Sequence, residues 1–154
     1  MDLKPSQGCY ALIRHFEGCK LQAYQDAVGI WTIGYGNTFF SGSRPVKKGD
    51  TITQDRAEDL LKLVVEKFAI SVDAMVKRHI KQHEFDALVS FCYNCGIGNL
   101  EKSTLLRKVN ANAPADEIAA EFMKWDKAGG KVLPGLTRRR LAESYLYKHA
   151  QNNF

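Results

Sequence analysis

Three residues near the start of the chain, Glu17, Asp26 and Thr32, have the types and spacing for acid–base chemistry on a water molecule. Glu17 directly precedes Gly18, and glycine commonly ends a helix. The negative end of the helix dipole favours the protonated form of a carboxyl group, which suits Glu17 to the role of general acid. Taken alone, Glu17 is explained more simply as a solvated acid at a helix end.

Asp26 and Thr32 lie three residues before and three residues after Gly29. A turn centred on Gly29 would make the two residues cross-strand partners on one face of a hairpin. The carboxylate could then accept a proton from a water molecule that the threonine hydroxyl orients, as attack on a sugar carbon from one side requires. Individually, an aspartate in a turn and a threonine in a strand are ordinary residues.

The elements that must position these residues follow from the apolar spacing. Cys9, Leu12, Ile13 and Phe16 share one helical face, which predicts a helix over about residues 7–17. Aromatic and β-branched residues on both sides of Gly29 predict a hairpin with strands at 21–24 and 30–35. We therefore expect the first helix and the hairpin to carry the three candidates.

Helices dominate the rest of the chain. The polar stretch 39–50 predicts a connection, after which Thr53 can cap a helix whose apolar spacing continues to Met75. Further helices are predicted at 82–95, 105–110, 116–125 and 136–149. A helix, a small hairpin, a long helix and more helices indicate an α+β fold rather than an alternating one.

Composition is that of one folded domain with a basic surface. Of the 154 residues, 45% are hydrophobic and 25% are charged, which excludes a disordered or collagen-like chain. The 22 basic and 17 acidic residues give a formal net charge of +5, which favours anionic partners. We find no signal peptide and no apolar run of membrane-spanning length, so we expect the chain to start in a cytoplasm.

The cysteines and histidines do not predict a metal site. Cys92 and Cys95 form a C-x-x-C inside an expected buried helix, without the two further ligands that zinc needs. Cys9 and Cys19 flank the first helix, too far apart for a disulfide, so free thiols are expected. His79 and His83 lack a third ligand. We expect neither a metal nor an organic cofactor.

A run of three arginines, Arg138, Arg139 and Arg140, precedes Leu141 and Tyr145 in the last predicted helix. One interpretation is a solvated face, which is the usual role of a charge run. The other is a basic amphipathic helix that is attracted to an anionic partner, such as an acidic cell-wall polymer or an anionic membrane.

The string FEGCKLQAYQDAVGIWTIGYGNT, residues 16–38, resembles the phage lysozyme family, glycoside hydrolase family 24. That family places an aspartate nine residues after the catalytic glutamate and a threonine six residues later, within E-G-x-x-L-x-A-Y-x-D-x-x-G-x-x-T-I-G-Y-G. Similarity extends through residues 86–110 and 124–147. This chain departs from many relatives at Asn37, where they have histidine.

The resemblance implies a single lysozyme-like domain over residues 1–154, with an active-site cleft between two lobes. The small β lobe would cover about 17–52 and the linking helix about 53–80. The helical lobe would combine 81–154 with the helix at 6–17. The resemblance also implies that six residues contact the sugar chain: Thr38, Tyr93, Asn94, Ser103, Gly135 and Leu136. Tyr93, within an apolar helix, is equally well explained as a core aromatic.

In function, the resemblance implies a muramidase that cleaves peptidoglycan with Glu17 as acid, Asp26 as base and Thr32 as water holder, by inversion. A lytic transglycosylase needs the acid alone and is the nearest alternative. A cationic wall-binding or membrane-binding protein without catalysis, or a nucleic-acid binder, is a further one. We expect a monomer that needs no nucleic acid and depends on a holin. It would wait in the host cytoplasm until lysis and then act on the cell wall or in the periplasm.

Overall fold

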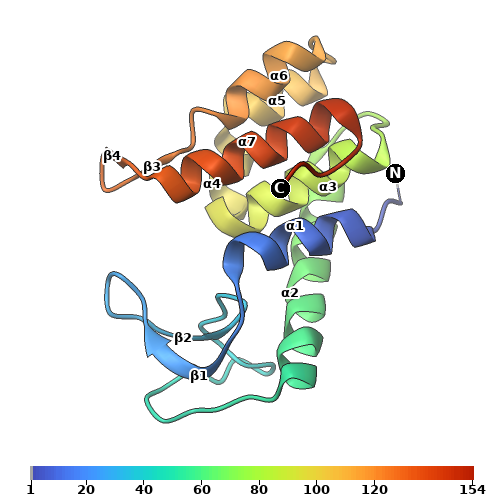
Figure 1. Cartoon of the computed structure of the whole chain (residues 1–154). Coiled ribbons are helices and arrows are strands. Elements are labelled where there is room, and N and C mark those ends of the chain that lie inside the picture. Colours follow the sequence, from blue (N-terminus) through green and yellow to red (C-terminus); the bar gives the residue numbers. More distant parts are fainter. Residues whose placement is uncertain (1) are drawn as a thin grey trace. The chain divides into compact units, whose positions relative to one another are not determined.

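The computed structural model describes residues 2–154, which form two compact units (Figure 1). The helical unit comprises Met1–Ile13 and Glu66–Phe154, and the hairpin unit comprises Arg14–Val65. The units divide within α1 and α2, whereas the sequence predicted lobe boundaries near residues 17 and 52. In chain order the elements are α1 (Gln7–Glu17), β1 (Lys20–Gln25), β2 (Trp31–Gly34), α2 (Gln54–Met75), α3 (Gln82–Cys95), α4 (Ile97–Lys102), α5 (Thr104–Asn110), α6 (Ala115–Phe122), β3 (Lys127–Ala128), β4 (Lys131–Val132) and α7 (Pro134–His149).

These elements confirm the predicted α+β class, with many helices and a small antiparallel sheet. None of the helices in residues 2–154 is both long enough and apolar enough to cross a membrane.

Helix α1 has both of its predicted ends. Its buried face is formed by Cys9, Leu12 and Ile13. At the C-terminal end, Gly18 adopts a left-handed conformation with φ 65°, and its N–H donates to the carbonyl of Arg14 at 3.0 Å. A residue with a side chain would be strained there, so the glycine ends the helix and leaves Glu17 as its last residue.

The hairpin forms as predicted, but its register differs by one residue at the turn. Thr32 pairs with Tyr24, and the N–H of Asp26 donates to the carbonyl of Ile30 at 2.9 Å. The turn is therefore centred on Val28, and the predicted direct pairing of Asp26 with Thr32 is wrong. Because side chains alternate along a strand, Asp26 follows Tyr24 on the same face and is a diagonal neighbour of Thr32.

Helix α2 begins where the sequence predicted. The N–H of Arg56 donates to the Thr53 hydroxyl oxygen at 3.1 Å, which caps the first turn. The loop before it joins the sheet, since the N–H of Ala23 donates to the carbonyl of Asp50 at 2.9 Å. The buried side of the helix is formed by Ala57, Leu61, Val65, Ala69 and Val72. The loop before the helix thus supports β1.

In the helical unit, α7 packs against α3 and α6 (Figure 1). Phe91 lies at the centre of this packing, with the rings of Phe122 and Trp125 edge-on to it at 5.8 and 5.4 Å between centroids. Edge-to-face pairs add specific attraction to the burial of the rings. The core of this unit therefore depends on aromatic contacts among helices that are distant in sequence.

Two features of the helical unit were not predicted. The short helix α4 contains Gly98 and follows Gly96, and both glycines indicated only an interruption of the pattern. The second is the hairpin of β3 and β4, in which Ala128 pairs with Lys131 across Gly129 and Gly130. Both turn glycines have positive φ, 58° and 80°, as a two-residue hairpin turn requires.

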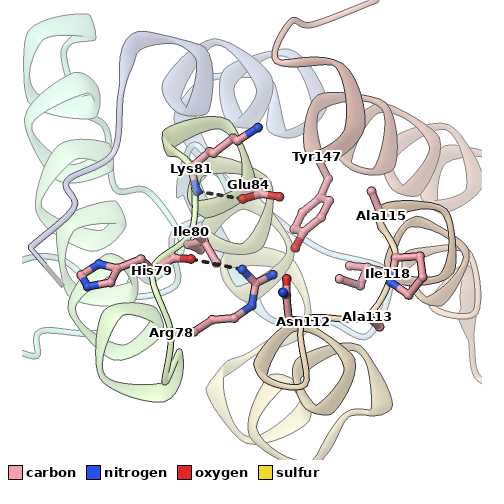
Figure 2. Close-up of a pocket in the computed structure, with 11 residues that line it drawn as sticks. Arg78, His79, Ile80, Lys81, Glu84, Asn112, Ala113, Ala115, Ile118 and Tyr147 are labelled. Atoms are coloured by element: carbon pink, nitrogen blue, oxygen red, sulfur yellow. Dashed lines mark hydrogen bonds between the residues drawn. The ribbon is translucent and has the colours of Figure 1, made fainter.

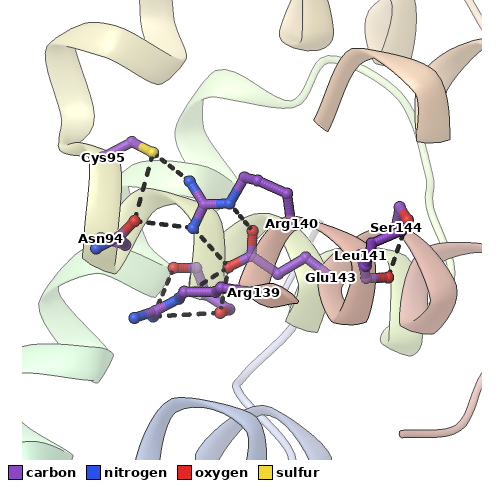
Figure 3. A network of polar contacts seen from close by, with 8 residues as sticks. Asn94, Cys95, Arg139, Arg140, Leu141, Glu143 and Ser144 are labelled. Atoms are coloured by element: carbon purple, nitrogen blue, oxygen red, sulfur yellow. Dashed lines mark hydrogen bonds and ion pairs between the residues drawn. The ribbon is translucent and has the colours of Figure 1, made fainter. Parts of the chain in front are cut away.

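The arginine run does not form the predicted basic face. Arg139 and Arg140 are 3% and 0% exposed and form ion pairs with the buried carboxylate of Glu143, as Figure 3 shows. Ser90 of α3 donates to the same carboxylate at 2.6 Å. Only Arg138 of the run is exposed. The solvated-face and membrane-attraction interpretations are therefore wrong for two of the three arginines.

We expect Glu143→Gln to lower the free energy of unfolding by about 3–5 kcal/mol, because it leaves two buried guanidinium groups without their counter-charge. The measurement is chemical denaturation monitored by circular dichroism. Asp116→Asn is the matched control, because the Asp116–Lys148 pair is exposed and screened by solvent. That variant should unfold close to wild type. Equal losses in the two variants would contradict the buried-charge explanation.

Candidate active site

Glu17 is held against bare backbone at the turn after β2. The Glu17 side chain is half-buried. A Cβ placed on Gly36 would lie only 2.6 Å from Oε1 of Glu17, and the φ of Gly36 is +80°. A real Cβ essentially never comes so close to another heavy atom. The Glu17 carboxyl therefore occupies space that exists because residue 36 has no side chain.

The turn that carries Gly36 is fixed by Asn37, the residue at which this chain departs from many relatives. Asn37 is buried, and its Oδ1 accepts from the N–H of Tyr35 at 3.2 Å. Its backbone exchanges two hydrogen bonds with Ile33, at 2.8 and 2.9 Å. Asparagine at this position thus supports the turn that approaches Glu17.

The Asp26 carboxylate is anchored by its own turn. Its Oδ1 accepts from the N–H groups of Val28 and Ile30, at 3.0 and 2.8 Å. No described residue bonds to Oδ2. This Asx-type turn fixes the orientation of the carboxylate and leaves one oxygen able to accept a proton.

Thr32 is almost completely buried, and its hydroxyl donates to the carbonyl of Ile30 at 2.9 Å. The single hydroxyl proton is therefore committed to the backbone. The oxygen keeps its capacity to accept, so Thr32 is suited to receive a hydrogen bond from a water molecule rather than to give one.

Tyr24 connects the two carboxyl groups electrostatically, although the sequence patterns assigned it no role. Burial raises the pKa of the Tyr24 hydroxyl above its usual value, and the negative charges of Glu17 and Asp26 raise it further. Both carboxyl groups thus act on the same phenol. The structure therefore brings Glu17, Asp26 and Thr32 together with Tyr24 in the hairpin unit.

A polar network next to the turn that carries Gly36 was also missed. The Arg14 guanidinium pairs with Glu58 at 2.8 Å, and the Tyr35 hydroxyl donates to the same carboxylate at 2.5 Å. Gln54 donates to the Tyr35 hydroxyl at 3.1 Å. The network joins α1, the turn beside Gly36 and the first turns of α2. Tyr35 lies in the G-Y-G motif, but nothing in the sequence pairs Arg14 with Glu58.

The network lowers the pKa of the Glu58 carboxyl group. The hydrogen bond from Arg14 is the main cause that lowers the pKa of Glu58 below its ordinary value, and burial opposes this effect. The hydrogen bond from the Tyr35 hydroxyl lowers it as well. Glu58 therefore stays ionised in the folded chain, which suits a structural role in joining Arg14 of α1 to Tyr35.

The six predicted sugar contacts fall in both units. Thr38 belongs to the hairpin unit, where its carbonyl accepts from the N–H of Val46 at 3.0 Å. Tyr93 belongs to the helical unit and packs its ring on Phe68, with 5.6 Å between centroids. The remaining four, all in the helical unit, are Asn94, Ser103, Gly135 and Leu136. Their contact with sugar stays a prediction.

Two of these residues already have structural roles. Ser103 is buried, donates to the carbonyl of Leu100 at 2.7 Å and accepts from the N–H of Leu106 at 3.0 Å, which caps α5. Asn94 is exposed, and its Oδ1 accepts from Arg140 at 2.9 Å. Helix capping therefore explains Ser103 without any ligand, whereas the exposed Asn94 retains its amide nitrogen.

All four cysteines, Cys9, Cys19, Cys92 and Cys95, have free thiols. Burial raises the pKa of Cys92 to about 12, so this thiol stays protonated and unreactive. In the described part of the chain, no group of three or more His, Cys, Asp or Glu side chains is arranged to hold a metal ion.

Known proteins are similar to this chain in both sequence and fold. A family model described as phage lysozyme matches residues 14–143. The chain is 42% identical to an endolysin of Bacillus phage B103, an alignment that covers 92% of this chain and 53% of that protein. It is 39% identical to an endolysin of Acyrthosiphon pisum secondary endosymbiont phage 1, over 90% of this chain and 94% of the relative. The chain thus spans about half the length of the Bacillus phage relative.

Solved structures agree. An endolysin from Escherichia coli O157:H7 phage FAHEc1 superposes with a TM-score of 0.92 at 36% identity, and the match covers 100% of this chain and 99% of that one. The muramidase domain of SpmX from Asticaccaulis excentricus gives a TM-score of 0.83 at 35% identity, over 95% and 98% of the two chains.

We expect Gly36→Ala to reduce the clearing of peptidoglycan suspensions by about 100-fold, because the new methyl group displaces the Glu17 carboxyl. Gly42→Ala is the matched control. Gly42 has a similar φ, +81°, but nothing lies within 4 Å of an added Cβ. Both variants should lose about 1 kcal/mol of stability from backbone strain, while only the first loses activity. Similar activity in the two variants would refute the steric explanation.

A second expectation concerns acid stability. A carboxyl whose pKa is lowered by folding stabilises the folded state above its ordinary pKa, and this contribution disappears as the pH falls through the lowered value. Glu58→Gln should therefore lower the melting temperature at pH 7 and make it less sensitive to pH below about 4. Because the pair is partly exposed, the effect should be on the order of 1 kcal/mol or less. Parallel melting curves from pH 2 to pH 7 would count against this role of Glu58.

Proposed function

Because this chain belongs to the phage lysozyme family, we propose that it hydrolyses the β-1,4 bond between N-acetylmuramic acid and N-acetylglucosamine in bacterial peptidoglycan. Its role would be that of an endolysin in host cell lysis. The names of its relatives, endolysin and muramidase, support this proposal. The observation that carries it is the pairing of a half-buried Glu17 with an anchored Asp26 carboxylate whose Oδ2 is unbonded.

In the proposed reaction, Glu17 donates its proton to the glycosidic oxygen as the bond to the sugar breaks. Positive charge develops on the sugar ring, and the ionised Asp26 stabilises it. Asp26 also accepts one proton from the attacking water, so the proton lost by the acid is balanced by the proton gained by the base. No further group is required for proton transfer.

The hydrogen bonds of Asp26 and Thr32 support a defined orientation of this water. Oδ2 of Asp26 and the oxygen of Thr32 are both acceptors, because the threonine proton is donated to Ile30. A water molecule that donates one hydrogen to each directs its remaining lone pairs away from them and toward a sugar carbon. Attack from the face opposite the leaving oxygen inverts the configuration, for which carboxyl groups about 6.5–9.5 Å apart are needed.

The alternatives are less well supported. A lytic transglycosylase would leave the anchoring of Asp26 and the buried Thr32 without a chemical role. A non-enzymatic cationic protein would need a basic surface, and the arginine run contributes only Arg138 to it. A hydrolase uses all three candidates.

Substrate binding would involve five residues that contact the glycan strand: Thr38, Tyr93, Asn94, Gly135 and Leu136. Ser103 would contribute through the helix that it caps. We also predict that the protein is a monomer and that it depends on a holin for release from the host cytoplasm. Contact of α7 with a membrane is a further prediction. Of these, membrane contact has the weakest support, because Arg139 and Arg140 are buried.

Glu17→Gln should abolish the clearing of purified peptidoglycan, with a loss of at least about 1000-fold, because the amide has no proton to donate. Asp26→Asn should lose about 100-fold or more, since the base is removed while the hairpin turn can persist. Asp55→Asn, an exposed acid in the same unit, is the control and should be fully active. Lysis by folded Glu17→Gln at the wild-type rate would refute the proposal.

The products distinguish the mechanisms. Mass spectrometry of the digest should show reducing ends for a hydrolase and 1,6-anhydro ends for a transglycosylase. Proton NMR at the earliest time points should show the inverted anomer first. Retained configuration at those times would overturn the water-holding role of Thr32.

A further inference from the structure

The helical unit contains a cavity of about 550 Å³ that none of the candidate site residues lines. Its walls come from five places: the segment after α2, the first turn of α3, the connection between α5 and α6, the start of α6, and α7 (Figure 2). The volume falls in the range of small-molecule sites. The lining residues that matter here are Arg78, Glu84, Asn112, Ile118 and Tyr147.

The Tyr147 hydroxyl is an unpaired donor in this cavity. The residue is 1% exposed, and its hydroxyl has no hydrogen-bond partner among the described residues. Figure 2 shows the hydroxyl directed toward Arg78 and Asn112. The Arg78 guanidinium opposes the burial that raises the pKa of Tyr147, through its charge and through a side-chain contact in which Arg78 can only donate. The hydroxyl proton itself has no acceptor among the described residues. Buried hydroxyl groups in native proteins nearly always have a partner.

Arg78 is held in a fixed orientation beside this hydroxyl. Its Nε donates to the carbonyl of Val109 at 2.5 Å, and its Nη1 donates to the carbonyl of His79 at 3.1 Å. Neither acceptor is charged, and no described carboxylate forms a salt bridge with Arg78. A guanidinium that is pinned by two backbone carbonyls, and that no described carboxylate neutralises, is already ordered to bind a carboxylate.

The start of α6 adds two more donors. Pro114 has no side-chain cap to offer, and its carbonyl accepts from the N–H groups of Glu117 and Ile118. The N–H groups of Ala115 and Asp116 make no hydrogen bond in the described part of the chain. Exposed N–H groups at a helix start favour a negative ligand.

Glu84 limits the charge that the cavity can accept. One of its oxygens accepts from the N–H of Lys81 at 2.7 Å. Among the described residues that line the cavity, Glu84 is the only one with a carboxyl group. In Figure 2 the ring of His79 points away from Tyr147. A doubly charged phosphate would be repelled by Glu84 more strongly than a singly charged carboxylate.

We propose that this cavity binds the carboxylate end of a small peptide, with the carboxylate between Arg78 and Tyr147. The apolar side chains of Ile80 and Ile118 and the nearby Ala113 suit a short aliphatic side chain on the last residue. This binding activity goes beyond hydrolysis and does not depend on it, since it uses no residue of the proposed catalytic set.

The test is an NMR titration of the ¹⁵N-labelled full chain with N-acetyl-alanyl-alanine. Its C-terminal amide is the matched ligand, because it lacks only the negative charge. The acid should shift the amide signals of Ala115 and Asp116 and saturate at a Kd of about 1 mM, as expected for a ligand of this size. The amide should bind at least about 10-fold more weakly.

Tyr147→Phe is the decisive variant, because it removes only the unpaired hydroxyl. It should melt at or above the wild-type temperature and bind the acid about 3- to 10-fold more weakly. Arg78→Gln should weaken binding by about 10-fold or more, and Arg107→Gln, an exposed arginine of α5, should bind like wild type. Glu17→Gln should also bind normally, whether or not it is inactive.

Four results would overturn the proposal. The first is wild-type affinity in Tyr147→Phe, and the second is equal affinity for the acid and its amide. The third is a marked fall in the melting temperature of Tyr147→Phe, which would mean that the hydroxyl is already satisfied in the fold. Inorganic phosphate that binds more tightly than the peptide would overturn the charge limit assigned to Glu84 and with it the choice of a carboxylate.

Discussion

The close approach of the Glu17 carboxyl to the backbone of Gly36 is the constraint on which the candidate site depends. It requires two left-handed glycines, Gly18 to end α1 directly after the glutamate and Gly36 to leave room for its carboxyl. It also requires that α1 keeps a fixed position relative to the turn that carries Gly36. The ion pair of Arg14 with Glu58, and the bond from Tyr35 to the same carboxylate, provide that restraint within the hairpin unit.

The two groups proposed to act on water are positioned differently from the acid. Asp26 is oriented by N–H groups of its own turn, and Thr32 is oriented by the carbonyl of Ile30 in the same hairpin. Their orientation thus needs only a few consecutive residues, whereas that of Glu17 needs contacts between elements. A short segment can therefore prepare both water acceptors before any substrate arrives, which is how preorganisation reduces the cost of reaching a transition state.

Local features could be predicted from the sequence, and features set by distant partners could not. The helix end at Glu17 and the cap at Thr53 depend on residues within one turn of the chain, and both are found where expected. The hairpin register was missed by one residue because the bonds to the Asp26 side chain, rather than Gly29 alone, set the turn. The burial of Arg139 and Arg140 depends on Ser90 and Glu143, and on packing that a charge run does not reveal. The spacing of the candidates Glu17, Asp26 and Thr32 could be read from the sequence because the three residues lie in one continuous motif.

The buried arginines also change what the net charge of the chain means. Arg139, Arg140 and Glu143 together carry a net positive charge that lies inside the helical unit, so part of the formal +5 is not displayed to the solvent. The field of a buried charge still reaches the solvent, but a direct ion pair with an anionic polymer needs an exposed cation, and Arg139 and Arg140 cannot form one. If the chain acts on the cell wall as proposed, it should therefore make fewer direct ion pairs with the wall than the composition implies, and easier detachment would let it reach uncut strands.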